Sequence, residues 1–141
     1  MDALPDWDSL QVLTRDVPRA ARGYSTNLYA PRDEVERWSA TGQLRTLVMD
    51  GAVLVVRPDR DFHRVYHVAR DPATLTGALT QLPAGRYVAD LVGRDPALDE
   101  LCAAYADGGF VSHAFLRRMG SASGVALPPT DDVAVAVPGD A

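Results

Sequence analysis

Lysine is absent from this chain of 141 residues, and all 14 of its basic residues are arginine. This absence excludes Schiff-base chemistry and a lysine general base. Cysteine occurs once, as Cys102, so neither an internal disulfide nor a cysteine-based metal cluster is expected. No run of about 18 apolar residues is present, which argues against a membrane-spanning helix. The first residues are acidic and lack the apolar core of a signal peptide, so we expect a cytoplasmic protein.

The composition is that of one globular domain. Apolar side chains make up 47% of the chain, and its length suits a single core. The net charge of −5 argues against nucleic acid and anionic membranes as partners. We expect an N-terminal extension over residues 1–25, a domain over 26–120 and a flexible tail or linker over 121–141. Within that tail, the alternating residues 133–137 alternatively pair as an edge strand.

The middle of the chain predicts an antiparallel meander. Three β-type segments follow one another at 44–49, 52–57 and 62–69. Asp50-Gly51 separates the first two, and Asp-Gly between apolar runs is a strong hairpin signal.

Helices and further strands are predicted around this meander. Apolar spacing and capping residues predict helices over 7–14, over 31–40, from Asp71-Pro72 to Leu82, and from Asp95-Pro96 to Gly108. Strands are predicted over 86–92 and 110–119. Strands that alternate with helices favour crossover connections. The expected class is α/β (α+β), with a mixed, mostly antiparallel sheet and helices on both of its faces.

This order of elements resembles the GCN5-related N-acetyltransferase (GNAT) superfamily, and its closing stretch is the most telling part. Many GNAT proteins end with a helix, then Gly-Phe, then a strand that finishes in Arg-Met, and this chain carries Gly109-Phe110 and Arg118-Met119 there. The resemblance covers roughly residues 26–120. The opening Thr26-Asn-Leu-Tyr and the stretch 60–66 resemble more narrowly the degenerate GNAT-like half that precedes a catalytic half in some tandem proteins.

The resemblance implies acetyl-coenzyme A as the cofactor, but the junction that would bind its pyrophosphate differs here. GNAT enzymes place a Gln/Arg-x-x-Gly-x-Gly/Ala loop between the fourth strand and the next helix, whose N-terminus helps to hold the pyrophosphate. The corresponding stretch, 68–75, keeps only Arg70 as a cofactor-binding residue. Asp71 brings negative charge to the helix N-terminus and Pro72 removes one N–H donor, so both disfavour acetyl-coenzyme A.

Asp90 and His67 are the candidate catalytic bases. In GNAT-like folds the fourth and fifth strands splay apart to form the acceptor cleft, which implies that these two side chains face each other. Asp90 also lies within an apolar strand, where a carboxylate needs a partner. The alternatives are an ion pair between Asp90 and an arginine such as Arg64 or Arg94, and a packed structural role for His67.

Tyr66 is the candidate catalytic acid, and Arg64 is a candidate ligand for an anionic or carbonyl substrate. Both lie on the strand face opposite to His63 and His67, because side chains alternate along a strand. Alternatively, Tyr66 packs under a helix and the stem of Arg64 covers it. His63 and His67 share a face, but no third ligand is evident, so no metal site is expected.

Tyr24 and Asn27 are candidate substrate-binding residues in a polar and aromatic loop beside the predicted cleft. Such loops often close over a substrate. Both residues are also ordinary turn residues, so the sequence leaves their role open.

Two classes of function remain. The altered junction favours a non-catalytic GNAT-like module for binding, dimerisation or regulation, with a second copy of the chain or a catalytic GNAT protein as partner. The alternative is a GNAT-fold enzyme that acts on a small molecule, either as an N-acyltransferase or as a repurposed biosynthetic enzyme without acetyl-coenzyme A. A small-molecule ligand is compatible with both.

Overall fold

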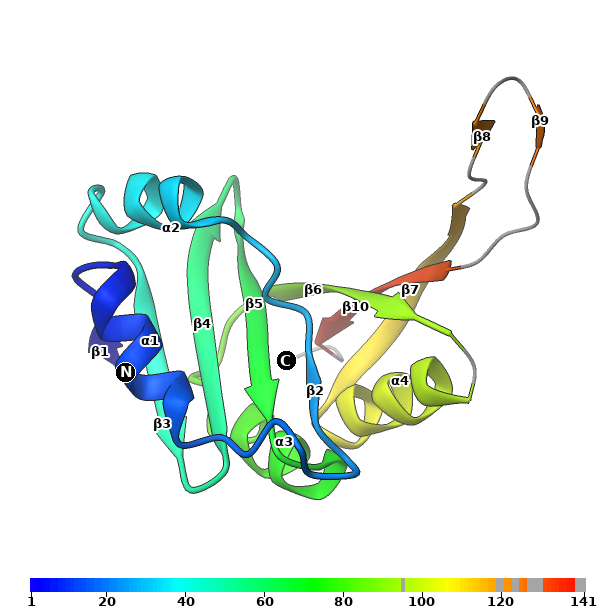
Figure 1. Cartoon of the computed structure of the whole chain (residues 1–141), viewed down its shortest axis with the longest axis horizontal. Coiled ribbons are helices and arrows are strands. Elements are labelled where there is room, and N and C mark those ends of the chain that lie inside the picture. The colour runs from blue at the N-terminus through cyan, green and yellow to red at the C-terminus, as the bar shows by residue number, and fades with distance from the viewer. Residues whose placement is uncertain (95, 119–120, 123–124, 127–130, 139–141) are drawn as a thin grey trace.

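The computed structural model describes residues 1–94, 96–118, 121–122, 125–126 and 131–138. It confirms the expected class, because a mixed, mostly antiparallel sheet carries helices on both faces (Figure 1). The described helices are α1 (Trp7–Arg15), α2 (Arg32–Ser39), α3 (Pro72–Leu79) and α4 (Ala97–Asp107). The strands of the sheet are β1 (Asp2–Ala3), β2 (Ser25–Thr26), β3 (Arg45–Met49), β4 (Ala52–Asp59), β5 (Phe62–Ala69), β6 (Tyr87–Gly93), β7 (Phe110–Arg118) and β10 (Asp131–Pro138), while β8 (Ser121–Ala122) and β9 (Val125–Ala126) pair with each other.

The predicted meander is present in β3, β4 and β5. Residues 45–49 pair antiparallel with 52–56, and 52–59 pair antiparallel with 62–69. Gly51 closes the first hairpin with a φ of +86°, a conformation that favours glycine. A Cβ at this position would also lie 2.8 Å from Cζ of Arg70, so the hairpin lies close under that side chain.

Two of the helices begin at the capping residues that the sequence contains. Asp6 accepts a hydrogen bond from the backbone N–H of Ser9 at the start of α1. Asp71 does the same for Thr74 at the start of α3, where Pro72 occupies the first turn. Among the described residues, no helix has the length and apolar character needed to cross a membrane.

The end of the chain corrects one expectation. We expected a tail or linker over 121–141, with an edge strand at 133–137 as the alternative. Residues 131–138 instead form β10, which lies inside the sheet and pairs antiparallel with both β6 and β7. The alternating Val-Ala-Val-Ala-Val sequence suits a strand that has neighbours on both edges. Met119, the end of the Arg-Met motif, lies outside the described residues.

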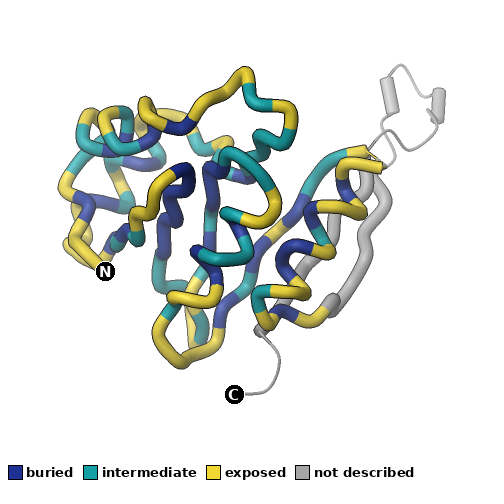
Figure 2. The backbone as a smooth tube through the Cα atoms, turned by 90° about the horizontal axis from the view of Figure 1, so that it is seen from below, coloured by how far each residue is buried: buried dark blue, intermediate teal, exposed yellow. Residues whose placement is uncertain are grey.

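The sheet separates two hydrophobic cores. Ala52, Leu54 and Val56 of β4 point toward α3 and α4, whereas Val53 and Val55 point toward α1 and α2. This alternation follows from the two-residue period of a strand. Figure 2 shows the resulting pattern, with buried backbone along the central strands and exposed residues on the outer turns.

The parallel pair β5 and β6 separates soon after it begins. Pairing joins only His63 with Tyr87 and Arg64 with Val88, although both strands continue for several residues. Beyond these positions β6 runs away from β5 toward β10 (Figure 1). We call the space between the two diverging strands the strand gap, because the expected acceptor cleft corresponds to it.

Candidate functional site

The side chain of Asn27 occupies the strand gap. Its Nδ2 donates to the carbonyl of Val65 on β5 at 3.3 Å and to the carbonyl of Asp90 on β6 at 3.1 Å. Its Oδ1 accepts from the backbone N–H of His67 at 2.6 Å. Where β5 and β6 diverge, their backbone groups can no longer bond to each other, and the Asn27 amide supplies the missing hydrogen-bond partners. The Asn27 side chain is buried between the two strands.

Strand β2 fills the wider end of the gap. Ser25 and Thr26 pair antiparallel with Ala69 and Val68, so β2 lies alongside β5 where β6 has moved away (Figure 1). The carbonyl of His67 accepts from the hydroxyl of Thr26 at 2.8 Å and from the N–H of Asn27 at 3.3 Å. An extended ligand in the gap would therefore compete with residues 25–27 for the same edge of β5.

The N-terminus of α3 is also occupied by groups of the chain itself. Asp71 accepts from the N–H of Thr74 at 2.7 Å, and this hydrogen bond holds the pKa of the Asp71 carboxyl below its usual value. Gly23 packs against this junction, since a Cβ there would lie 3.0 Å from Cβ of Asp71 and 3.1 Å from Cδ of Pro72. The sequence predicted the negative charge of Asp71 at this helix end, and the structure shows in addition that the loop at Gly23 covers it.

Arg70, the candidate cofactor-binding residue, is directed to partners within the chain. Its guanidinium donates to Asp71 at 3.2 Å and to the hydroxyl of Thr74 at 3.2 Å, and lies 4.0 Å from the carboxylate of Asp50. It also packs over Gly51. These contacts tie the β3–β4 hairpin to the start of α3.

His67 is completely buried and lies in a chain of three side chains. Its Nε2 is 3.0 Å from the hydroxyl of Ser25, and its Nδ1 is 2.8 Å from the hydroxyl of Tyr105 on α4. Burial lowers the pKa of the His67 imidazole from 6.5 to about 3, and it raises the pKa of the Tyr105 phenol. The ring is therefore neutral near pH 7, donating from one nitrogen and accepting at the other. Such a ring is a weak base at neutral pH.

Asp90 does not face His67, which corrects the expected catalytic pair. Its neighbours Ala89 and Leu91 point into the core that contains His67, so Asp90 points to the opposite face of the sheet. There its carboxylate accepts from Arg64 at 2.9 Å. The ion pair that the sequence offered as the alternative is the one present.

Arg64 lies between two carboxylates. Its Nε donates to Asp59 at 2.8 Å, and its Nη1 donates to Asp90. The hydrogen bond from Arg64 holds the pKa of the Asp59 carboxyl below its usual value. Arg64 thereby links β5 to β4 and β6 through its two carboxylate partners. An anionic substrate would have to displace one of these carboxylates.

We predict a small effect from Asp90→Asn. The Asp90 side chain is 51% exposed, and solvent screening limits such ion pairs to about 0–1 kcal/mol. The free energy of unfolding, measured with urea, should therefore fall by less than about 1 kcal/mol. Asp61→Asn is the matched control, because Asp61 forms an exposed pair with Arg86. A loss far above that of the control would contradict the screened surface role.

Tyr66 packs in the manner of the structural alternative. Its ring stacks on Trp38 of α2 with centroids 5.3 Å apart, and its hydroxyl accepts from Arg57 at 3.1 Å. The guanidinium of Arg57 lies 4.5 Å from the centre of the Trp38 ring, a cation–π contact. The phenol that we considered as an acid is thus held under a helix.

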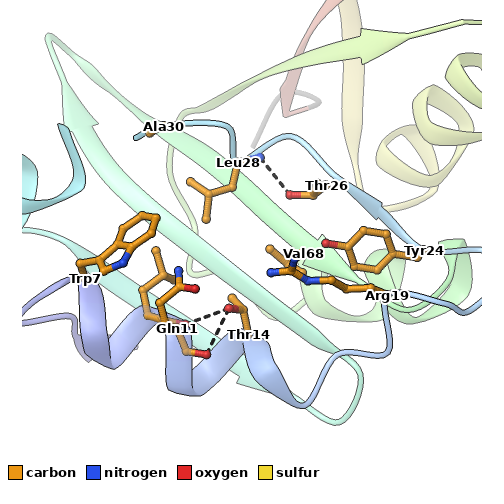
Figure 3. A pocket seen from close by; sticks show the side chains of 10 residues that line it. Trp7, Gln11, Thr14, Arg19, Tyr24, Thr26, Leu28, Ala30 and Val68 are labelled. Carbon is orange, nitrogen blue, oxygen red and sulfur yellow. Dashed lines mark hydrogen bonds between the residues drawn. The ribbon is translucent and has the colours of Figure 1, made fainter. Parts of the chain in front are cut away.

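Tyr24 forms none of the hydrogen bonds that fill the strand gap, and instead lines a pocket beside the 19–30 segment (Figure 3). The pocket has a volume of about 310 Å³ and lies between α1, this segment and Val68 of β5. Trp7 and Arg19 line it as well, and neither was singled out by sequence reasoning. Their only sequence signal is that aromatic and basic residues occur near Tyr24, which is too common to be diagnostic.

The candidate residues therefore divide into separate groups. Asn27 and His67 lie at the strand gap, Arg64 with Asp90 and Tyr66 lie on the α1/α2 face, and Tyr24 lines the pocket.

In the part of the chain that the structure describes, no three His, Cys, Asp or Glu side chains are grouped as a metal site would need. No family model, curated protein or solved structure matches this chain.

Proposed function

We propose that this chain is a non-catalytic GNAT-like module that acts by binding, dimerisation or regulation. The observation that carries the proposal is the occupied strand gap. Asn27 and β2 form the hydrogen bonds on the edge of β5 from which β6 diverges, and Asn27 also bonds to β6. In a GNAT-like enzyme this gap would be the acceptor cleft, so its filling by the chain itself favours a role other than acyl transfer.

The N-terminus of α3 supports the same proposal. A pyrophosphate there would meet the carboxylate of Asp71, lose the N–H that Pro72 lacks, and have to displace the loop at Gly23. Three local features thus oppose an anionic group at this helix end. Arg70 favours one, but its guanidinium is engaged with Asp71 and Thr74.

The candidate acid and bases support it further. His67 is buried with a pKa of about 3, Asp90 is paired with Arg64, and Tyr66 is stacked under α2. A catalytic role would need at least one of these groups to reach a substrate. As the resemblance implies, the partner in this proposal is a second copy of the chain or a catalytic GNAT protein.

Acetyl-coenzyme A is the ligand that tests the proposal. Thermal unfolding and titration calorimetry of the full chain should show no stabilisation and no saturable heat with it. A ligand present at 100 times its Kd stabilises a folded protein by about 2.7 kcal/mol, so binding would be easily detected. A saturable heat together with such a shift would contradict the proposal and favour the acyltransferase alternative.

A further inference from the structure

The pocket beside Tyr24 combines apolar walls with several polar side chains. Trp7, Leu28 and Val68 form apolar walls, and Figure 3 shows Arg19, Tyr24 and Gln11 around the same space. Polar groups that converge on an apolar hollow are the usual composition of a small-molecule site. Its volume of about 310 Å³ limits the occupant to a small molecule.

Arg19 is the feature that selects the charge of the ligand. The guanidinium is exposed at the pocket, and within the described part of the chain it forms no ion pair or hydrogen bond. The side-chain amide of Gln11 and the hydroxyl of Tyr24 likewise have no hydrogen-bond partner among the described residues. A guanidinium binds a planar carboxylate through two parallel hydrogen bonds, so a carboxylate is an anion that fits this side chain.

The aromatic walls select the rest of the ligand. Trp7 and Tyr24 are both partly buried, and they approach the pocket from α1 and from the segment before β2. Aromatic rings contribute strongly to binding when they contact another ring in an offset or edge-to-face arrangement. Because these rings and Arg19 line one space, a single small molecule with a ring and a carboxylate would contact all three.

We propose that this pocket binds a small aromatic carboxylate, with Arg19 as the carboxylate ligand and Trp7 and Tyr24 as contacts to the ring. The inference deepens the proposed binding function and rests on it. Thr26 connects the two sites, because it lines the pocket while its hydroxyl donates to the carbonyl of His67 in the strand gap. A bound ligand would therefore hold α1 against the segment that fills the gap.

Calorimetric titrations with indole-3-acetate and phenylacetate test the inference, with the corresponding neutral amides as matched probes. We expect saturable binding of the acids and weaker binding of the amides. Arg19→Gln should raise the Kd for the acids by about tenfold, as expected for loss of one charge-assisted contact. Arg22→Gln is the control, since Arg22 is exposed in the same loop and does not line the pocket. Thermal unfolding of both variants checks that they fold.

Three outcomes would overturn the inference. They are no saturable binding of either acid at millimolar concentration, equal binding of acids and amides, and equal weakening by Arg19→Gln and Arg22→Gln. None of these bears on the acetyl-coenzyme A titration, which tests the proposed function by itself. Binding of acetyl-coenzyme A would contradict the non-catalytic role, whatever the aromatic acids do.

Discussion

Replacing Asn27 with alanine should lower the free energy of unfolding by about 3 kcal/mol. The substitution removes three hydrogen bonds, to the carbonyls of Val65 and Asp90 and from the N–H of His67. Each buried backbone group left without a partner costs about 1–3 kcal/mol, and a water molecule that enters the vacated space recovers part of this. Urea denaturation of the wild-type chain and the variant measures the difference.

Two further variants make the Asn27 result specific. Asn27→Asp keeps the shape and the acceptor for His67, but it places a carboxylate oxygen against two carbonyls, so it should also destabilise the fold. Gln43→Ala removes an exposed amide and should change stability by no more than about 0.5 kcal/mol. If Asn27→Ala changed the free energy of unfolding no more than Gln43→Ala does, the amide would not stabilise the filled strand gap. The main support for the non-catalytic proposal would then be lost.

Local signals in the sequence predict the meander and the start of α3. Asp50-Gly51 supplies the residue type that a tight turn with positive φ requires. Asp71-Pro72 supplies a side-chain acceptor and a fixed φ at a helix start. In both cases the residues that determine the structure lie within a few positions of each other, so no knowledge of the tertiary fold is needed.

Asn27 shows why the strand gap escapes prediction. The partners of its side chain are 38, 40 and 63 residues away in the sequence. A short run of Ser, Thr and Asn is typical of a turn, and nothing within it indicates that it pairs with a distant strand. The same limit applies to β10, whose position between β6 and β7 depends on the edges that those strands leave open.

His67 illustrates a prediction that is right locally and incomplete globally. Alternation along β5 correctly placed His63 and His67 on one face, opposite to Arg64 and Tyr66. The environment of that face depends on Tyr105, which comes from a helix 38 residues later. The sequence therefore identified the face of the residue and offered a packed role as one alternative, but it did not identify Tyr105 as the partner in that buried environment.

That burial makes the fold sensitive to acid. In the unfolded chain an imidazole takes up a proton near pH 6.5, whereas the folded His67 resists protonation until its pKa of about 3. Between these values the unfolded state binds one more proton, so stability is retained above pH 6.5 and falls as the pH decreases. Each pH unit costs about 1.4 kcal/mol, so acidification from about pH 7 to about pH 4.5 should remove about 2–3 kcal/mol.

Urea midpoints measured across this pH range test the prediction in the wild-type chain and in two variants. His67→Gln retains an amide that can bond to Ser25 and Tyr105 but does not titrate, so its stability should be nearly independent of pH above about 4.5. His63→Gln removes an exposed ring from the same face and leaves the buried one, so the acid sensitivity should persist. The lower limit matters, because carboxylates such as Asp59 and Asp71, whose pKa values are lowered in the folded state, add their own acid sensitivity below it.

If His67→Gln does not fold, the wild-type chain still decides the question through the protons taken up on unfolding. Calorimetric unfolding near pH 5 in buffers of different ionisation enthalpy should give an uptake of about one proton. An uptake near zero would mean that folded His67 is already protonated at this pH. A protonated ring could no longer accept a hydrogen bond at either nitrogen, so both Ser25 and Tyr105 would have to act as acceptors. Such a ring would remove one of the observations that support the non-catalytic proposal, the lowered pKa of His67.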